Sequence, residues 1–249
     1  ENVELIWFPT GGGKTEAYLG LIAISSFHRR ISQNTINQEK AAPGIHSIMR
    51  YTLRLLTADQ AGRLVRACGA MNLVADEEGI GQHDGFMPFR VGMWIGKDAS
   101  PNDFFSKSDW SQQSSAQSII DAAKGLEETG EDCTVAQFPT CPWCGDKSVG
   151  DAANYEICVQ PWSRDKPVLN VACKNSACPF SAGVPFTSVD EDIYLNPPSI
   201  LLGTADKFAQ LALNPRPKTI GENDDYANIN VETLDARNMM GFAQGDGGP

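Results

Sequence analysis

The sequence predicts an α/β fold, a parallel sheet with flanking helices, into which a small cysteine-containing module is inserted. Three observations support this prediction. A glycine-rich loop stands between an apolar strand pattern and a helix pattern near the start of the chain, and two later segments repeat the order of strand followed by helix. Between those two segments, four cysteines occur as two short pairs. We therefore expect an α/β lobe with an inserted metal-binding module.

The composition is that of an ordinary globular protein. The chain has 249 residues, 41% of them hydrophobic, which allows one large or two small domains. No apolar run is long enough to span a membrane and no signal peptide opens the chain, so we expect a cytoplasmic protein with no membrane partner. The seven cysteines are then reduced thiols or metal ligands rather than a disulfide framework.

Charge is unevenly distributed along the chain. The net charge is −11, which by itself argues against a nucleic-acid partner. Residues 28–70 nevertheless carry a local charge of +5, and the field close to a surface decides whether phosphates bind there. A phosphate-binding surface in this segment is therefore compatible with the acidic composition.

The loop at residues 9–15, Pro-Thr-Gly-Gly-Gly-Lys-Thr, has the residue order that cradles a nucleotide phosphate. The apolar residues 3–8 predict a strand before it, and residues 15–27 predict a buried helix after it, because apolar side chains occupy most of the helix circumference. Glycine amides can bind anionic oxygens, Lys14 can reach the terminal phosphates, and the Thr15 hydroxyl can bind Mg²⁺. The predicted ATP site consists of Pro9, Thr10, Gly11, Gly12, Gly13, Lys14, Thr15 and Glu16, with Lys14 and Thr15 as its catalytic residues.

One position departs from the general phosphate-loop pattern, which has a glycine six residues before the lysine. Phe8 occupies that position here. The alternative interpretation is a glycine-rich turn that contains Lys-Thr by chance. The strand and helix patterns on either side of the loop disfavour it.

Two further segments combine a strand with a capped helix. In residues 47–74, Thr57 and Gln60 form a capping-box pattern that should start a helix. The apolar face of that helix comprises Ala61, Leu64, Val65, Cys68 and Met71, with Arg63 and Arg66 on the opposite side. In residues 197–213, a buried strand should be followed by a helix that Thr204 caps. Either segment alone could be ordinary α/β scaffolding with solvated arginines.

Together, the three segments resemble motifs I, Ia and Ib of superfamily 2 helicases, which commonly lack the first loop glycine. The stretches "RYTLRLLTADQ" and "GTADKFAQL" are similar to those of the large helicase of DISARM phage-defence systems. The resemblance implies a RecA-like motor lobe, hydrolysis of ATP with Mg²⁺, DNA as substrate and a companion subunit. It also implies that motifs Ia and Ib grip one nucleic-acid strand, here through Thr52, Arg54, Gln60, Arg63, Gly203, Thr204, Asp206 and Lys207.

The cysteine pairs have the spacing of a tetrahedral Cys₄ zinc site. The predicted ligands are Cys141, Cys144, Cys173 and Cys178. Four thiolates leave no open coordination position, so the zinc would be structural. Among the remaining cysteines, Cys68 should lie in the core, Cys133 has no partner at ligand spacing, and Cys158 is the reserve ligand.

The aromatic residues of the module allow two interpretations. Trp143, Trp162 and Phe180 could offer a surface on which bases stack, or they could form the small core that such a module needs. We favour the core.

The motifs divide the chain into three parts. Residues 1–132 form the first part of the motor lobe, residues 133–190 the zinc-ribbon insertion, and residues 191–249 the return to the lobe with motif Ib and a glycine-rich loop. Residues 86–102 predict another strand, and residues 103–132 a loop with one short helix. The second acidic box and the second lobe of a superfamily 2 ATPase are not recognisable here. We expect this segment alone to be inactive.

Three other functions are compatible with parts of the pattern. A helicase of another DNA-repair or defence system would share the motifs. A non-catalytic module could bind nucleic acid or a protein through the zinc ribbon and keep a vestigial nucleotide loop, although the intact Lys14 and Thr15 argue against it. A small-molecule P-loop kinase is disfavoured by the cysteine insertion and by the arginine-rich second segment.

Overall fold

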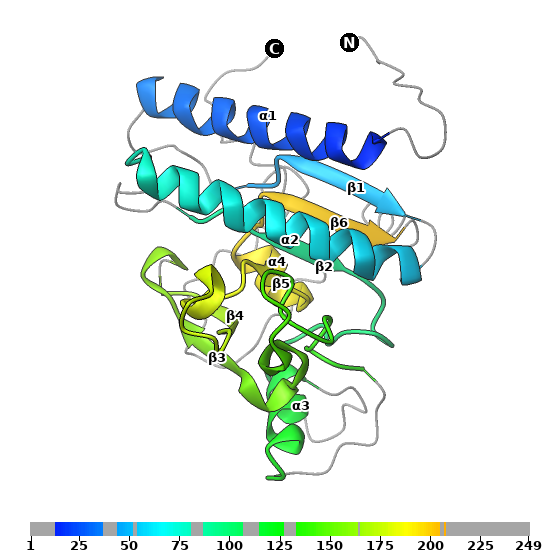
Figure 1. Cartoon of the computed structure of the whole chain (residues 1–249). Coiled ribbons are helices and arrows are strands. Elements are labelled where there is room, and N and C mark those ends of the chain that lie inside the picture. Colours follow the sequence, from blue (N-terminus) through cyan, green and yellow to red (C-terminus); the bar gives the residue numbers. More distant parts are fainter. Residues whose placement is uncertain are drawn as a thin grey trace, which may run out of the picture.

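A parallel sheet of four strands organises the described part of the chain, in the order β1-β6-β2-β5 (Figure 1). Its strands are β1 (Ser47–Tyr51), β6 (Ile200–Thr204), β2 (Val91–Trp94) and β5 (Phe186–Thr187). All three neighbouring pairs run parallel. The expected mixed α/β architecture is confirmed, and the strand at residues 199–204 is buried along its whole length, as predicted.

The computed structural model describes residues 13–36, 44–51, 54–80, 87–106, 115–126, 133–163, 165–204 and 207. For residues 32–36, 51 and 54–59 it describes the backbone only. The predicted strand at residues 3–8 and most of the predicted helix after Thr204 lie outside these ranges.

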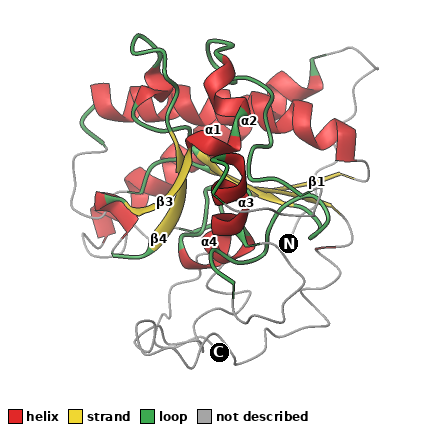
Figure 2. Cartoon of the chain, turned by 90° about the horizontal axis from the view of Figure 1, so that it is seen from below, coloured by secondary structure: helices red, strands yellow, loops and turns green. Residues whose placement is uncertain are grey.

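Helices cover both faces of the sheet (Figure 2). Helices α1 (Lys14–Ile36) and α2 (Arg54–Glu77) lie on one face, and the short helix α4 (Asp190–Leu195) lies on the other. Side chains alternate between the faces: Val91 and Met93 belong to the core under α2, whereas Trp94 packs with Ile193 and Leu201 on the α4 side. Every residue of β2 is therefore buried, as in a parallel sheet covered on both faces.

Helix α2 confirms the predicted apolar face but begins earlier than predicted. Ala61, Leu64, Val65 and Cys68 are at most 1% exposed. The helix begins at Arg54, so Thr57 lies within it and the capping box at Thr57 and Gln60 was a wrong prediction. The residues before Thr57 are arginine and leucine, which favour helix and extend it toward β1.

Helix α1 is longer and more exposed than its sequence pattern predicted. It continues to Ile36, and among residues 14–31 only Ser26 and Arg30 are buried. Leu21 is 51% exposed and Ile24 is 70% exposed. The prediction of a buried helix was therefore wrong for the described part of the chain. Its other face packs against the core through Leu19, Ile22, Ala23 and Phe27.

The cysteine-containing part packs directly against the sheet layer. An antiparallel hairpin of β3 (Tyr155–Val159) and β4 (Pro167–Val171) lies between the two cysteine pairs. The predicted short helix is α3 (Ala116–Ala123). Single 3₁₀ turns occur at Lys147–Gly150, Ala152–Asn154, Pro161–Ser163 and Pro179–Ser181.

Within the described residues, this part shares its hydrophobic core with the sheet layer. One continuous cluster of buried residues joins the apolar face of α2 to Cys141, Cys173, Cys178 and Phe180. Strand β5, which falls inside the predicted insertion at residues 133–190, pairs with β2 in the main sheet. The two parts are therefore fused through one core.

Among the described residues, none of the helices combines the length and the apolar character needed to cross a membrane.

Candidate nucleotide and metal sites

The structure describes the end of the predicted nucleotide loop, from Gly13 onward. Gly13 has a positive φ of 73°, which glycine adopts without strain, and Lys14 begins α1. The N–H of Ala17 donates to the carbonyl of Gly13 at 3.1 Å and closes the first helical turn. Pro9, Thr10, Gly11 and Gly12 lie outside the described residues.

The N-terminal ends of α1 and α2 lie at the carboxyl edge of the sheet, beside the arrowheads of β1 and β6 (Figure 1). Glu16 on α1 forms an ion pair with Arg63 on α2. The side chains are 64% and 33% exposed, so the pair contributes little to stability, about 0–1 kcal/mol. Its significance is positional, because it joins the residue two places after Lys14 to a predicted nucleic-acid contact.

The strand ends that carry the other predicted nucleic-acid contacts are also adjacent. In the register of β1 and β6, Arg50 lies opposite Gly203 and Tyr51 opposite Thr204. Gly203 and Thr204 are buried, and Gln60 is half-buried. Thr52 and Asp206 lie outside the described residues, as does the side chain of Arg54.

Lys207 has a partner inside the protein. Its Nζ lies 2.6 Å from Oδ2 of Asp190 and 5.8 Å from the centre of the Trp94 ring. Only 7% of the residue is exposed. The Lys207 ammonium therefore faces Asp190, and its contact with nucleic acid stays a prediction.

The four predicted metal ligands converge on one point. Their sulfur atoms all lie within 4.8 Å of one another. Sγ of Cys141 is 3.9 Å from that of Cys178, and Sγ of Cys144 is 3.5 Å from that of Cys173. Zinc bound tetrahedrally at about 2.3 Å requires sulfur atoms about 3.8 Å apart. The donor set and its spacing therefore fit zinc.

Local backbone geometry presents N–H groups to three of the sulfur atoms. The Asp146 amide bonds the Cys144 thiolate and lowers its pKa to about 7. Burial raises the pKa of Cys173 and of Cys178, and hydrogen bonds from the amides of Asn175 and Phe180 partly oppose this rise. Burial is the larger effect on Cys173 and raises its pKa to about 12, so metal binding there must displace a proton.

The remaining cysteines lie outside this cluster. Cys68 is completely buried, as predicted, and burial raises its pKa to about 12. Cys133 is buried too. The predicted reserve ligand, Cys158, instead accepts a hydrogen bond from Nε2 of Gln160 at 3.3 Å. The four assigned cysteines therefore suffice without a reserve.

The aromatic residues of the module act within the protein, in agreement with the core interpretation. Phe180 is 2% exposed and packs against Trp143 with ring centres 5.4 Å apart. Trp162 lies over the guanidinium of Arg90, 4.7 Å from its central carbon.

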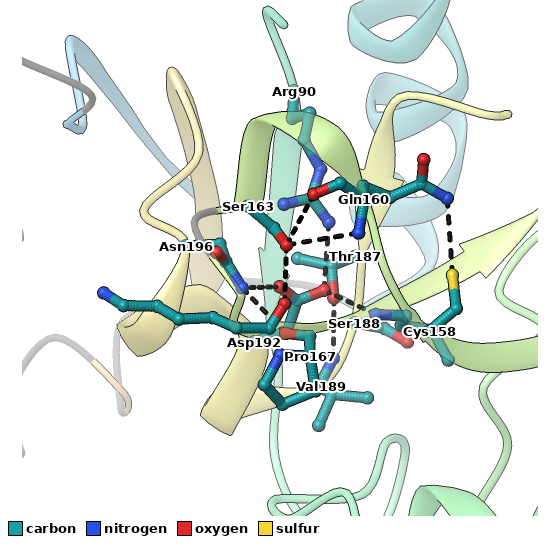
Figure 3. Close-up of polar contacts among 12 residues, drawn as sticks. Arg90, Cys158, Gln160, Ser163, Pro167, Thr187, Ser188, Val189, Asp192 and Asn196 are labelled. Carbon is teal, nitrogen blue, oxygen red and sulfur yellow. Dashed lines mark hydrogen bonds and ion pairs between the residues drawn. The ribbon is translucent and has the colours of Figure 1, made fainter. Parts of the chain in front are cut away.

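A buried polar network that sequence reasoning missed fastens the hairpin to α4 (Figure 3). The carboxylate of Asp192 is completely buried and accepts from Arg90 Nη2 at 2.9 Å and from the Leu169 amide of β4 at 3.0 Å. Asn196 donates to Asp192 and to the Pro167 carbonyl. Periodicity could not reveal this network, because an acidic stretch such as "DEDIY" also fits an exposed turn.

Comparison with known proteins finds similarity to a DISARM protein. No protein-family model matches the chain. Over 214 residues, 84% of its length, the chain is 34% identical to the DISARM protein DrmA of Bacillus paralicheniformis. The matched stretch is 18% of that protein, so the chain spans less than a fifth of the length of this curated relative. The similarity supports a DrmA-like protein.

Proposed function

Because the chain is similar to DISARM protein DrmA over most of its length, we propose that it forms most of the first motor lobe of an ATP-dependent DNA helicase or translocase. The enzyme is of the superfamily 2 type and acts in bacterial anti-phage defence, together with a companion subunit. The observation that carries this proposal is the placement of Lys14. It begins α1 directly after a left-handed glycine, at the carboxyl edge of a parallel sheet, where α/β proteins bind nucleotides.

In this proposal the chain binds the phosphates of ATP through the loop and the start of α1. The Lys14 ammonium neutralises the terminal phosphates, the loop amides bind their oxygens, and the Thr15 hydroxyl ligates Mg²⁺. Mg²⁺ held there would help to neutralise the negative charge of the terminal phosphates. Hydrolysis requires groups from the second lobe of the longer protein, so the segment alone should not turn over ATP.

The nucleic-acid surface follows from the neighbouring elements. Motifs Ia and Ib correspond to the adjacent ends of β1 and β6 and to the first turns of α2. Backbone amides and the side chains there would contact the phosphates of one DNA strand. Arg63 pairs with Glu16, so in this proposal the DNA strand and the nucleotide would lie on the two sides of one ion pair.

We also propose that the four cysteines hold a structural zinc ion. The fourfold thiol set offers no open position for a substrate, and the sulfur spacing suits a tetrahedral ion. The Cys₄ site and its hairpin then form a zinc ribbon whose task is architectural.

The decisive experiment is the substitution Lys14→Ala in the full protein. ATP hydrolysis should be abolished because the terminal phosphates lose their cation, whereas DNA binding in a filter or anisotropy assay should largely persist. Lys124→Ala, at the exposed end of α3, is the matched control and should leave both unchanged. Full hydrolysis by Lys14→Ala would overturn the nucleotide assignment.

Two alternatives make different predictions. A non-catalytic binding module with a vestigial loop would show no thermal stabilisation by an ATP analogue, with or without Mg²⁺. A helicase of another repair system would hydrolyse ATP but would give no protection against phage when expressed with its neighbouring genes.

A further inference from the structure

Helix α2 touches the cysteine turns at a glycine. A Cβ added to Gly69 would lie 2.3 Å from Cε1 and 2.7 Å from Cζ of Phe180, and 3.4 Å from Cζ3 of Trp143. A glycine inside a helix is less favourable than alanine by about 1 kcal/mol. The close approach of the Phe180 ring is the physical reason for glycine at this position.

Both rings belong to the turns that carry the metal ligands. Trp143 stands between Cys141 and Cys144. The N–H of Phe180 donates to Sγ of Cys178 at 3.4 Å, and its carbonyl accepts from the N–H of Cys173 at 2.9 Å. The position of each ring is therefore set by the conformation of a cysteine turn.

A polar contact joins the same two surfaces one helical turn away. Nε of Arg66 on α2 donates to the carbonyl of Pro142 at 2.9 Å. Pro142 is the residue between Cys141 and Trp143. Helix α2 is thus held against the cysteine turns at residues 66 and 69, while its apolar face is held against the sheet.

We propose that the metal bound by the four cysteines positions helix α2. The ion would do so by fixing the cysteine turns, which pack against the side of this helix at Arg66 and Gly69. The proposal rests on the metal site and does not depend on motor activity. Without the ion, the four sulfur atoms lose the partner that keeps them together, the two turns separate, and the rings of Trp143 and Phe180 leave Gly69. The helix then loses its packing on this side.

The position of α2 matters because of what the helix carries. Arg63 lies one turn before Arg66 and pairs with Glu16, two residues after Lys14. A shift of α2 by a fraction of a helical turn would separate this pair. The metal site, although distant in sequence from the nucleotide loop, would in this way determine how α1 and α2 meet.

The first test is hydrogen–deuterium exchange on the full protein, loaded with zinc or stripped by a chelator. Peptides covering residues 61–75 of α2 should exchange about tenfold faster after stripping, because opening of the helix becomes easier. Peptides covering residues 17–31 of α1 serve as the internal reference and should change far less. Unchanged protection of α2, with loss of protection confined to residues 141–180, would overturn the proposal.

The second test uses two glycines of the same helix. Gly69→Ala pushes against the Phe180 ring and should speed zinc release to a chelating dye about tenfold, because the overpacked contact strains the turn that carries Cys178. Among the described residues, no atom outside the local backbone of the helix lies within 4 Å of a Cβ added to Gly62. Gly62→Ala is therefore the matched control and should release zinc at the original rate. Equal release rates for the two variants would contradict the proposal. Should Gly69→Ala fail to fold, the exchange experiment on the unaltered protein decides.

Discussion

Helices α1 and α2 lie side by side on the same face of the sheet and have nearly equal lengths, 23 and 24 residues, yet within the described residues α2 is the more deeply buried. The sheet lies on one side of α2 and the cysteine turns lie on another. Helix α1 packs on the core along one stripe, and within the described part of the chain its opposite stripe carries exposed Leu21 and Ile24. The difference shows that burial depends on how many elements surround a helix, and only secondarily on its composition.

The largest difference in the free energy of unfolding should appear when one leucine is truncated to alanine in each helix. Leu64 of α2 is 1% exposed, whereas Leu21 of α1 is 51% exposed. Leu64→Ala should lower the free energy of unfolding by about 2–5 kcal/mol, because it removes buried methyl groups and leaves a cavity. Leu21→Ala should change it by about 0.5 kcal/mol or less. Urea denaturation of both variants checks this, and equal losses would refute the contrast between the helices.

A second prediction concerns the way α1 is anchored. Arg30 is 6% exposed, lies 5.1 Å over the Phe89 ring and donates to Oγ of Ser199 at 3.4 Å. Burial lowers its pKa to about 10, so it stays charged at neutral pH. Arg30→Ala should destabilise the protein by about 1–3 kcal/mol through lost packing and hydrogen bonding. His28→Ala, at an exposed position of the same helix, is the control and should have almost no effect in the same thermal or urea assay.

A third prediction concerns the ion pair between the two helices, formed by Glu16 and Arg63. In a double-mutant cycle, Glu16→Gln and Arg63→Met should show a coupling energy of about 0.2–1 kcal/mol, because the pair is partly exposed. The coupling should shrink as salt rises from low to near-molar concentration. A coupling that is absent at low salt would mean that α1 and α2 meet independently of this pair.

The smallest expected effect is a dependence on pH. His46 Nε2 lies 2.9 Å from Oγ of Ser25 on α1, and burial, followed by the charges of Arg29 and Arg30, lowers the pKa of His46. The unfolded chain then binds more protons than the folded one below about pH 6.5, so stability should fall as the pH drops through that value. His46→Gln removes the titrating group and should flatten this part of the stability–pH curve. An unchanged slope would assign the dependence to other groups.

The order of elements and the metal ligands could be predicted because each depends on local pattern. A short apolar run with β-branched residues predicts β6, and helical spacing predicts the buried face of α2. Two close cysteine pairs predict a common site, which the structure assembles within 4.8 Å. Residues close together in the sequence determine the strand and the helix face. The four cysteines are brought together by their need to bind one ion.

The features that escaped prediction depend on contacts between distant segments. Nothing in the sequence around Gly69 indicates that the ring of Phe180 lies against it in the fold. Asp192 and Arg90 are common surface residue types, and only the fold brings them together in the interior. The motif that contains Lys207 gives no sign that its ammonium pairs with Asp190 inside the protein. The start of α2 shifted because helix-favouring residues precede Thr57.

Strands β2 and β5 are parallel neighbours, so the chain between them, residues 95–185, is a single long crossover. By connectivity alone most of this excursion is dispensable, since a crossover of about a dozen residues from Trp94 to Phe186 would preserve the strand order. The packing shows that it has a further role, because Trp143 and Phe180 of this excursion lie against Gly69 of α2, a helix that precedes it in the chain. Shortening its exposed turns should be tolerated. Removing the whole excursion should expose to water the side of α2 that packs on the cysteine turns.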